Sequence, residues 1–226
     1  MEYSIVRSRR KTVAIYILPA GTVEVRAPLK MPKADIDRIV SAKGKWIRDK
    51  LLVVKERANS KAEFHLIYGD CVLVKGREYP ITSRPGNRIG FDGTQIYVMP
   101  GLNSGQIKDA CVKIYKLMAK QFLPAKTLAY AAQMGVAASG VKINSAKTRW
   151  GSCSAKKSIN YSWRLMMAEE DVIDFVVVHE LAHIKEMNHS ARFWAVVAGV
   201  LPDYKERQLR LKALQKRLGA EEWEEY

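Results

Sequence analysis

VIDFVVVHELAHIKEMNH, residues 172–189, contains three of the four histidines of this 226-residue chain. His179 and His183 are four residues apart, so on a helix both imidazoles lie on one face and can share one ion. Glu180 completes the HExxH pattern, in which a carboxylate beside two metal ligands accepts a proton from water. His189 is the natural third ligand for a site that keeps its fourth position open. The stretch therefore predicts one bound divalent metal.

The helix that carries these histidines is expected to be buried, because residues 172–184 are apolar on nearly every side. Buried imidazoles and a buried carboxylate cost free energy unless a metal or hydrogen bonds satisfy them. Zinc is the usual metal of such a site, and nickel, cobalt and manganese also bind histidine. A hydrogen-bonded network without metal is the alternative, and three histidines in this setting argue against it.

The spacing of the three histidines equals that of the metzincin signature, HExxHxxGxxH. However, Glu186 stands where the signature has glycine, and no methionine follows Met187. The chain must therefore turn toward His189 in another way, and Asn188 is the candidate for a left-handed backbone there. These differences argue against a true metzincin.

A hairpin is expected just before the histidine helix, with extended segments at 147–153 and 158–165 joined by a polar turn. An edge strand beside a metal allows an extended peptide to add to the sheet as a further strand. The candidate substrate-binding residues of this region are Arg149, Ser152, Asn160 and Arg164. Arg149 suits either an anion or a structural ion pair.

The rest of the sequence predicts an α+β fold in two regions. Residues 1–102 form a β-rich region with two helices, which packs on the helical region that carries the histidines, residues 103–226; Pro100-Gly101 marks the boundary. Helices are expected over 33–41, 43–58, 104–135, from about 169, and over 203–218. Strands are expected over 3–9, 12–18, 22–28, 71–76, 77–83, 87–91, 94–100 and 141–144. In the last helix, the leucines expected to pack on the body are Leu209, Leu211, Leu214 and Leu218.

Composition limits the class of protein. The 38 basic and 23 acidic residues give a net charge of +15, spread through both regions. This excess suits a polyanionic partner such as nucleic acid, nucleotide or phosphate, or simply a solvated cationic surface. No apolar run approaches the roughly 18 to 20 residues that span a bilayer, so no membrane association is expected. Cys71, Cys111 and Cys153 are odd in number and form no CxxC pair, which favours free thiols in a reducing cytoplasm.

Three stretches together resemble the YgjP-like family of zincin-type metal-dependent hydrolases. They are RWGSCS (149–154), INYSWRL (159–165) and VVVHELAHIKEMNHSARFW (176–194). The resemblance extends over roughly the whole chain, including Tyr68-Gly69 and GREY (76–79). It implies a zincin-like catalytic unit related to SprT-like and minimal gluzincin-type peptidases. It also implies that His179, His183 and His189 are the metal ligands and that Glu180 is the general base.

These observations predict a hydrolase. The leading interpretation is a metallopeptidase. The rival is a nucleoside triphosphate diphosphatase, for which the metal and the basic residues Lys147, Arg149 and Arg164 would be suited, although no GxxxxGK[ST] loop is present. A peptidase acting on DNA-associated proteins is a third alternative, suggested by the charge. A non-catalytic binding module is disfavoured because Glu180 is intact beside its ligands. The substrate, peptide or nucleotide, and the oligomeric state stay open at this level.

Overall fold

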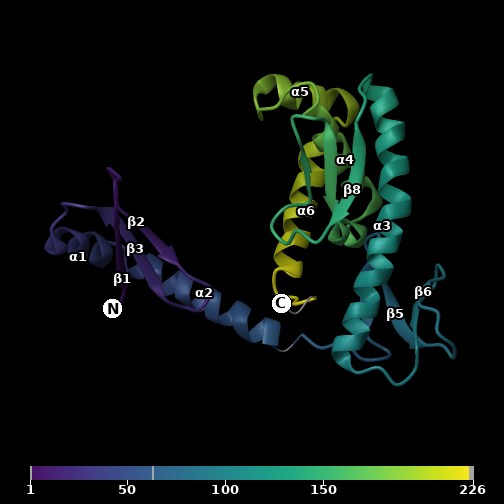
Figure 1. The fold of residues 1–226 in the computed structure, drawn as a ribbon, viewed down its shortest axis with the longest axis horizontal. Coiled ribbons are helices and arrows are strands. Elements are labelled where there is room, and N and C mark those ends of the chain that lie inside the picture. Colours follow the sequence, from purple (N-terminus) through teal and green to yellow (C-terminus); the bar gives the residue numbers. More distant parts are fainter. Residues whose placement is uncertain (1, 63, 224–226) are drawn as a thin grey trace. The chain divides into compact units, whose positions relative to one another are not determined.

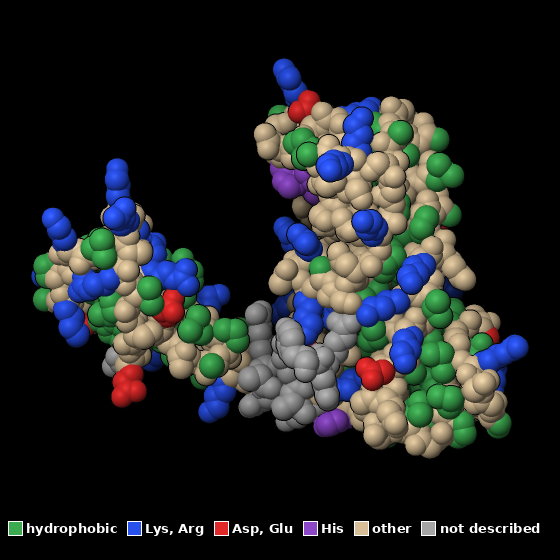
Figure 2. Space-filling view, viewed as in Figure 1, with side chains coloured by type: hydrophobic (Ala, Val, Ile, Leu, Met, Phe, Trp, Pro, Cys, Tyr) green, Lys and Arg blue, Asp and Glu red, His purple; other side chains and the backbone are tan. Residues whose placement is uncertain are grey.

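The computed structural model describes residues 2–62 and 64–223, and the chain divides into two compact units. Unit 1 consists of residues up to Phe64 together with Gly219–Glu222, and unit 2 consists of His65–Leu218 with Trp223. Strands and helices occur in both, so the predicted α+β class is confirmed (Figure 1). Lysine and arginine side chains are scattered over the visible face of both units (Figure 2).

Unit 1 is a three-stranded sheet with two helices. Its strands are β1 (Ser4–Ser8), β2 (Ala14–Ile17) and β3 (Val23–Pro28), in the order β1-β3-β2. The central strand β3 pairs in parallel with β1 and antiparallel with β2. The helices are α1 (Lys33–Ala42) and α2 (Gly44–Ala62). Alternate residues of β3 pack with one face of each helix, and the buried set is Val23, Val25, Ala27, Ile36, Val40 and Ile47.

Unit 2 begins with a four-stranded sheet. The strands are β4 (Cys71–Val74), β5 (Arg77–Ser83), β6 (Gly90–Phe91) and β7 (Ile96–Val98), in the order β4-β5-β7-β6. The turn between β4 and β5 is held against the segment before the histidine helix. Its two amides, at Lys75 and Gly76, donate to the carbonyls of Met166 and Met167.

The boundary between the two units lies after Phe64, whereas the sequence suggested Pro100-Gly101. The hydrogen bonds of the β4–β5 turn are one reason. Gly76 has φ +79°, and a Cβ at this position would overlap Glu169. Tyr115 also donates its hydroxyl hydrogen to the carbonyl of Leu73, at 2.6 Å. The strands from 71 to 98 therefore belong with the histidine-bearing helices. Pro100-Gly101 is a turn inside unit 2, because these long-range contacts have no signature in local composition.

The helix α3 (Ser104–Met134) runs through unit 2, as the sequence predicts. Asn103 begins it with a capping box to Gln106, and Gly135 ends it in the left-handed conformation. Its buried residues pack against α4, β7, β8 and the segment between β10 and α4. The helix continues through Pro124 as one element from Ser104 to Met134.

A second sheet packs against the histidine-bearing helix through one of its strands. Its strands are β8 (Gly140–Asn144), β9 (Gly151–Cys153) and β10 (Ser158–Ser162), in the order β8-β10-β9. The antiparallel β9–β10 pair confirms the predicted hairpin. The strand was expected to reach residue 165, but the chain instead forms a 3-10 helix, η1 (Trp163–Met167). All five η1 residues are buried, so the chain leaves the sheet here and turns into the core.

Three helices complete the unit: α4 (Glu170–Ala182), α5 (Ala191–Val200) and α6 (Tyr204–Leu218). The prediction for Leu209 is wrong, because its side chain is 65% exposed while Leu211 and Leu218 are buried. Residues 211, 214 and 218 follow the helical spacing of one face, and residue 209 points away from it. Among the described residues, no helix combines the length and apolar character needed to cross a bilayer.

Candidate metal centre

The helix α4 brings two histidines and a glutamate to one end of unit 2. It is apolar nearly all round, and nine of its residues are buried, which fixes its position against α3 and α6. His179 lies in the last turn of α4, and His183 is the C-cap residue with helical backbone angles. The two imidazoles therefore keep the four-residue helical spacing although the regular helix ends at Ala182.

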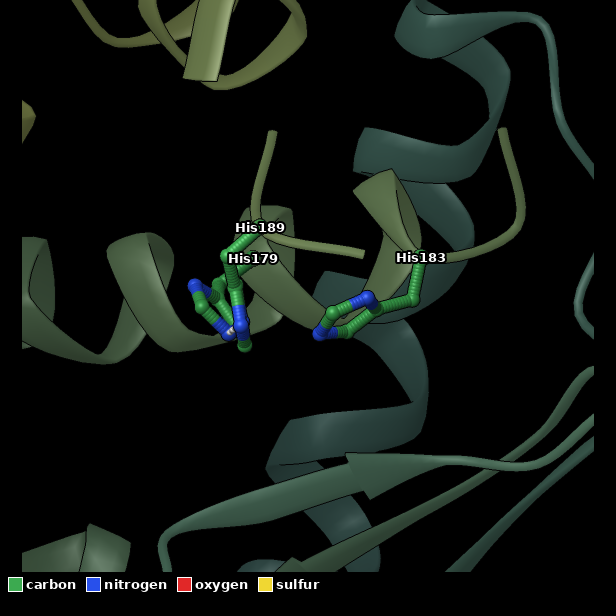
Figure 3. Close-up of side chains that lie close together, drawn as sticks. All are labelled: His179, His183 and His189. Carbon is green, nitrogen blue, oxygen red and sulfur yellow. Dashed lines mark hydrogen bonds between the residues drawn. The ribbon is translucent and has the colours of Figure 1, made fainter. Parts of the chain in front are cut away.

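His189 joins them from the loop between α4 and α5 (Figure 3). One ligand nitrogen from each of the three histidines lies within 4.8 Å of the others, and the Nε2 atoms of His179 and His189 are 3.1 Å apart. Three nitrogens at about 2.0–2.1 Å from a tetrahedral zinc would be about 3.3 Å from one another. The His179–His189 pair is close to this spacing, and the whole set is near enough for the three nitrogens to share one metal ion.

The surroundings of His179 and His183 favour the neutral imidazole that binds a metal. The Nδ1 atom of His183 lies 3.3 Å from the carbonyl oxygen of Glu186. If Nδ1 carries the proton and donates to that carbonyl, Nε2 is free for a metal. Burial lowers the pKa of His179 to about 3, with smaller contributions from His183 and His189. Burial also lowers the pKa of His183. Metal ligation requires neutral imidazole, so these environments suit a ligand set.

The centre has an aromatic support that the sequence analysis missed. The ring of Phe193, on α5, is fully buried and lies 4.9, 4.6 and 4.8 Å, centroid to centroid, from the rings of His179, His183 and His189. Ser190 begins α5 as its N-cap and accepts a hydrogen bond from the Phe193 amide, at 3.3 Å. The cap follows the third histidine directly. It therefore fixes the start of the helix that supports all three rings.

Glu180 is buried beside the histidines, with 5% of its surface exposed. Gly151 of β9 lies directly against it: a Cβ at that position would come 2.6 Å from Oε1 and 2.7 Å from Cγ of Glu180. Burial raises the pKa of Glu180 to about 8, and the positive charge of Arg149 opposes this. A bound dication would oppose it as well, because it favours the carboxylate form. The absence of a side chain on Gly151 thus makes room for Glu180.

The four candidate substrate-binding residues have different surroundings. Arg149 is exposed just before β9, and its charge acts on Glu180. Ser152 pairs with Asn160 across the β9–β10 ladder, and Gly151 pairs with Tyr161. Because successive strand residues point to opposite faces, Ser152 and Asn160 share the face away from Glu180. Gly151 lies against the carboxylate, whereas the two predicted residues Ser152 and Asn160 face away from it.

Arg164 is buried and already occupied. Its Nη1 atom donates to the carbonyl oxygen of Ser145, at 3.0 Å, and its guanidinium lies 4.3 Å over the Trp163 ring. These contacts hold the loop before β9 against η1. Direct contact of Arg164, Ser152 or Asn160 with a substrate stays a prediction.

The expected left-handed backbone at Asn188 is wrong. Among the described residues other than glycine, positive φ occurs at Lys75 and Lys157. The chain leaves α4 through hydrogen bonds from the amides of Lys185 and Glu186 to the carbonyl of Ala182. This tight turn at the helix end redirects the backbone toward His189, so no left-handed residue is needed.

Residues 11–214 match the model of a protein family described as YgjP-like, metallopeptidase domain. The chain belongs to this family. The match covers nearly the whole chain and makes this YgjP-like protein a hydrolase. It supports a metal-dependent peptidase with a divalent metal, typically zinc.

Two solved structures are similar to part of this YgjP-like chain. One is the metallopeptidase zymogen abylysin of Pyrococcus abyssi, at 26% identity and a TM-score of 0.38, covering 41% of this chain and 93% of that one. The other is the metallopeptidase zymogen jannalysin of Methanocaldococcus jannaschii, at 20% identity and a TM-score of 0.37, covering 43% and 98%. No curated protein sequence matches the chain significantly.

Proposed function

We propose that this protein is a peptidase in which His179, His183 and His189 hold one divalent metal, typically zinc, and Glu180 is the general base. The observation that carries the proposal is the convergence of three imidazoles, with two Nε2 atoms 3.1 Å apart, beside a buried carboxylate. Three histidine ligands leave one position of a tetrahedral ion open, which is the arrangement of catalytic rather than structural zinc sites.

A zinc ion held by the three histidines would supply a Lewis acid for the substrate carbonyl group and would lower the pKa of a water molecule to about 7. Glu180 then accepts the proton of the attacking water and passes it to the departing amine. The low polarity around Glu180 suits this cycle, because a buried carboxyl group changes protonation state more readily near neutral pH. Gly151 leaves the space in which the carboxylate lies against β9.

An extended peptide can approach along β9. This strand is at the edge of its sheet in the order β8-β10-β9, so its outer backbone groups have no partner strand among the described residues. A substrate that pairs with this edge lies beside Glu180, because Gly151 belongs to β9. Arg149 stands exposed at the start of the strand and can pair with a carboxylate or carbonyl oxygen of the substrate. Histidine side chains reach the surface next to α5, where a substrate has access to them (Figure 2).

The test compares zinc-loaded wild-type protein with Glu180→Gln. Each is incubated with a quenched unfolded-protein substrate and, in the same plate, with a panel of nucleoside triphosphates. We expect wild type to cleave the protein substrate and Glu180→Gln to lose at least about 100-fold in turnover, the usual contribution of a general base. Zinc content of both proteins is measured by atomic absorption and should be equal.

Glu206→Gln is the matched control, since it makes the same change on an exposed glutamate of α6 and should keep full turnover. Full activity of Glu180→Gln would contradict the assigned general base. Diphosphate release that depends on Glu180, without peptide cleavage, would overturn the peptidase and move the function to phosphoanhydride hydrolysis.

A further inference from the structure

A recess lies where α5 meets α6 in unit 2, outside the ligand set described above. Its volume is about 370 Å³, and its walls are formed by Trp194, Tyr204, Lys205, Gln208 and Leu209. The rings of Trp194 and Tyr204 are stacked, with centroids 5.2 Å apart and planes inclined by 16°. This is called the α5–α6 recess below.

The α5–α6 recess shares a wall with the metal centre. Trp194 stacks on His189 with ring centroids 5.9 Å apart and planes inclined by 24°, and its centroid is 5.8 Å from that of His179. Two stacking steps, of 5.9 and 5.2 Å, thus lead from His189 to Tyr204. An extended peptide advances about 3.3 Å per residue, so a side chain within about three residues of the bond cleaved can reach the recess.

The walls select for one kind of side chain. Two aromatic rings and Leu209 offer apolar surface, and none of the five lining residues is acidic. Aromatic and aliphatic groups gain free energy from burial against such a surface. The ammonium group of Lys205 disfavours a lysine or arginine guest. Leu209 itself is 65% exposed, so its side chain is available to a guest that settles over it.

We propose that the α5–α6 recess is a specificity subsite that binds an aromatic or large aliphatic side chain of the peptide substrate, within about three residues of the bond cleaved. The proposal rests on the peptidase function proposed above. It adds the kind of peptide that is preferred. It also gives Trp194 a contact with the bound side chain besides its contacts with His189 and Tyr204.

The test uses quenched peptides that differ at one position. The bond cleaved by zinc-loaded wild type is located by mass spectrometry, and Phe, Leu, Ser or Lys is then placed at each of three positions on either side. At one position we expect kcat/KM to be at least about tenfold higher for Phe or Leu than for Ser, with Lys lowest, as is usual for a filled apolar pocket. In Leu209→Asp this ratio should fall to about twofold or less.

Leu128→Asp is the matched control, since Leu128 is 74% exposed on α3 and lies outside the recess. It should keep the wild-type ratio. Peptide cleavage that depends on Glu180 but has a ratio unchanged by Leu209→Asp would overturn the subsite and leave the peptidase standing. Absence of any Glu180-dependent cleavage would overturn both. Light scattering adds a third outcome: a dimer that Leu209→Asp converts to a monomer, with the ratio unchanged, would assign the recess to a contact between two copies.

Discussion

β9 approaches the metal centre at Glu180, whereas α5 approaches it at the three imidazoles, and the two contacts work in opposite ways. At β9 the contact depends on a missing side chain, because Gly151 leaves the space that the carboxylate fills. At α5 it depends on a large side chain, because the ring of Phe193 touches His179, His183 and His189 together. We infer that the strand contact positions the proton acceptor and the aromatic contact positions the ligands. The two should therefore fail differently when changed.

Metal removal should produce the largest change, because both contacts adjoin the proposed metal site. A chelator is expected to abolish peptide turnover. It should also lower the free energy of unfolding by about 4 kcal/mol, the value expected when free metal exceeds its Kd about 1,000-fold. Calorimetric scans with and without zinc measure the shift. His189→Ala serves as the control, and its melting temperature should not respond to zinc. If the chelator left the melting temperature of wild type unchanged, this would argue against a bound metal.

Gly151→Ala breaks the strand contact. The new methyl group overlaps Oε1 and Cγ of Glu180, so the carboxylate must move. Turnover should fall by about 100-fold, the usual contribution of a positioned general base, and overpacking should cost about 1–3 kcal/mol of unfolding free energy. Steady-state kinetics and zinc titration separate the effects, since zinc affinity should stay within about threefold of wild type.

The matched control is Gly140→Ala, at the start of β8 in the same sheet. A Cβ at Gly140 has no neighbour within 4 Å, so this variant should behave as wild type. Equal loss in the two variants would mean that the sheet tolerates no alanine in general. That result would contradict the claim that Gly151→Ala acts through its contact with Glu180.

Phe193→Leu breaks the aromatic contact and should have a moderate effect. A smaller, flexible side chain no longer touches three imidazoles, so zinc affinity should fall by about tenfold, as for other outer contacts of metal ligands. Phe175→Leu is the control, because Phe175 is also buried but, of the three histidines, its ring contacts that of His179, with ring centroids 5.8 Å apart. Competition titrations with a zinc indicator and the visible spectrum of the cobalt form measure the difference. Equal zinc affinities in the two leucine variants would mean that Phe193 supports the histidines no more than Phe175 does.

Thiol labelling gives the smallest and most local test of the strand contact. Cys153 ends β9 half-buried, and its pKa is raised by burial and by the charge of Glu180. Burial raises the pKa of Cys111 to about 12. A higher pKa leaves less thiolate, so an alkylating reagent at pH 8 should modify exposed Cys71 first, Cys153 more slowly, and Cys111 only on unfolding. Mass spectrometry of timed samples gives the order. If Cys153 were labelled as fast as Cys71, the end of β9 would not be packed beside Glu180.

Local patterns in the sequence were enough for most elements. The alternation in residues 1–30 and 71–98 predicted seven strands, and each is observed near its expected place. The HExxH spacing predicted that His179 and His183 would share a helix face, and the polar turn after Cys153 predicted the hairpin. The helix α5 was not predicted, although Ser190 before an apolar run is an N-cap signal.

The sequence by itself determined the helix periodicity, the strand alternation and the identity of the chemically active residues, because these depend on neighbours a few positions apart. Only the tertiary structure decided that Gly151 lies on Glu180, that Phe193 supports three histidines and that β4–β7 belong to the catalytic unit. It also decided that Leu209 faces solvent beside Trp194 and Tyr204. Such contacts join residues distant along the chain. They depend on shape and packing density, which no local period encodes.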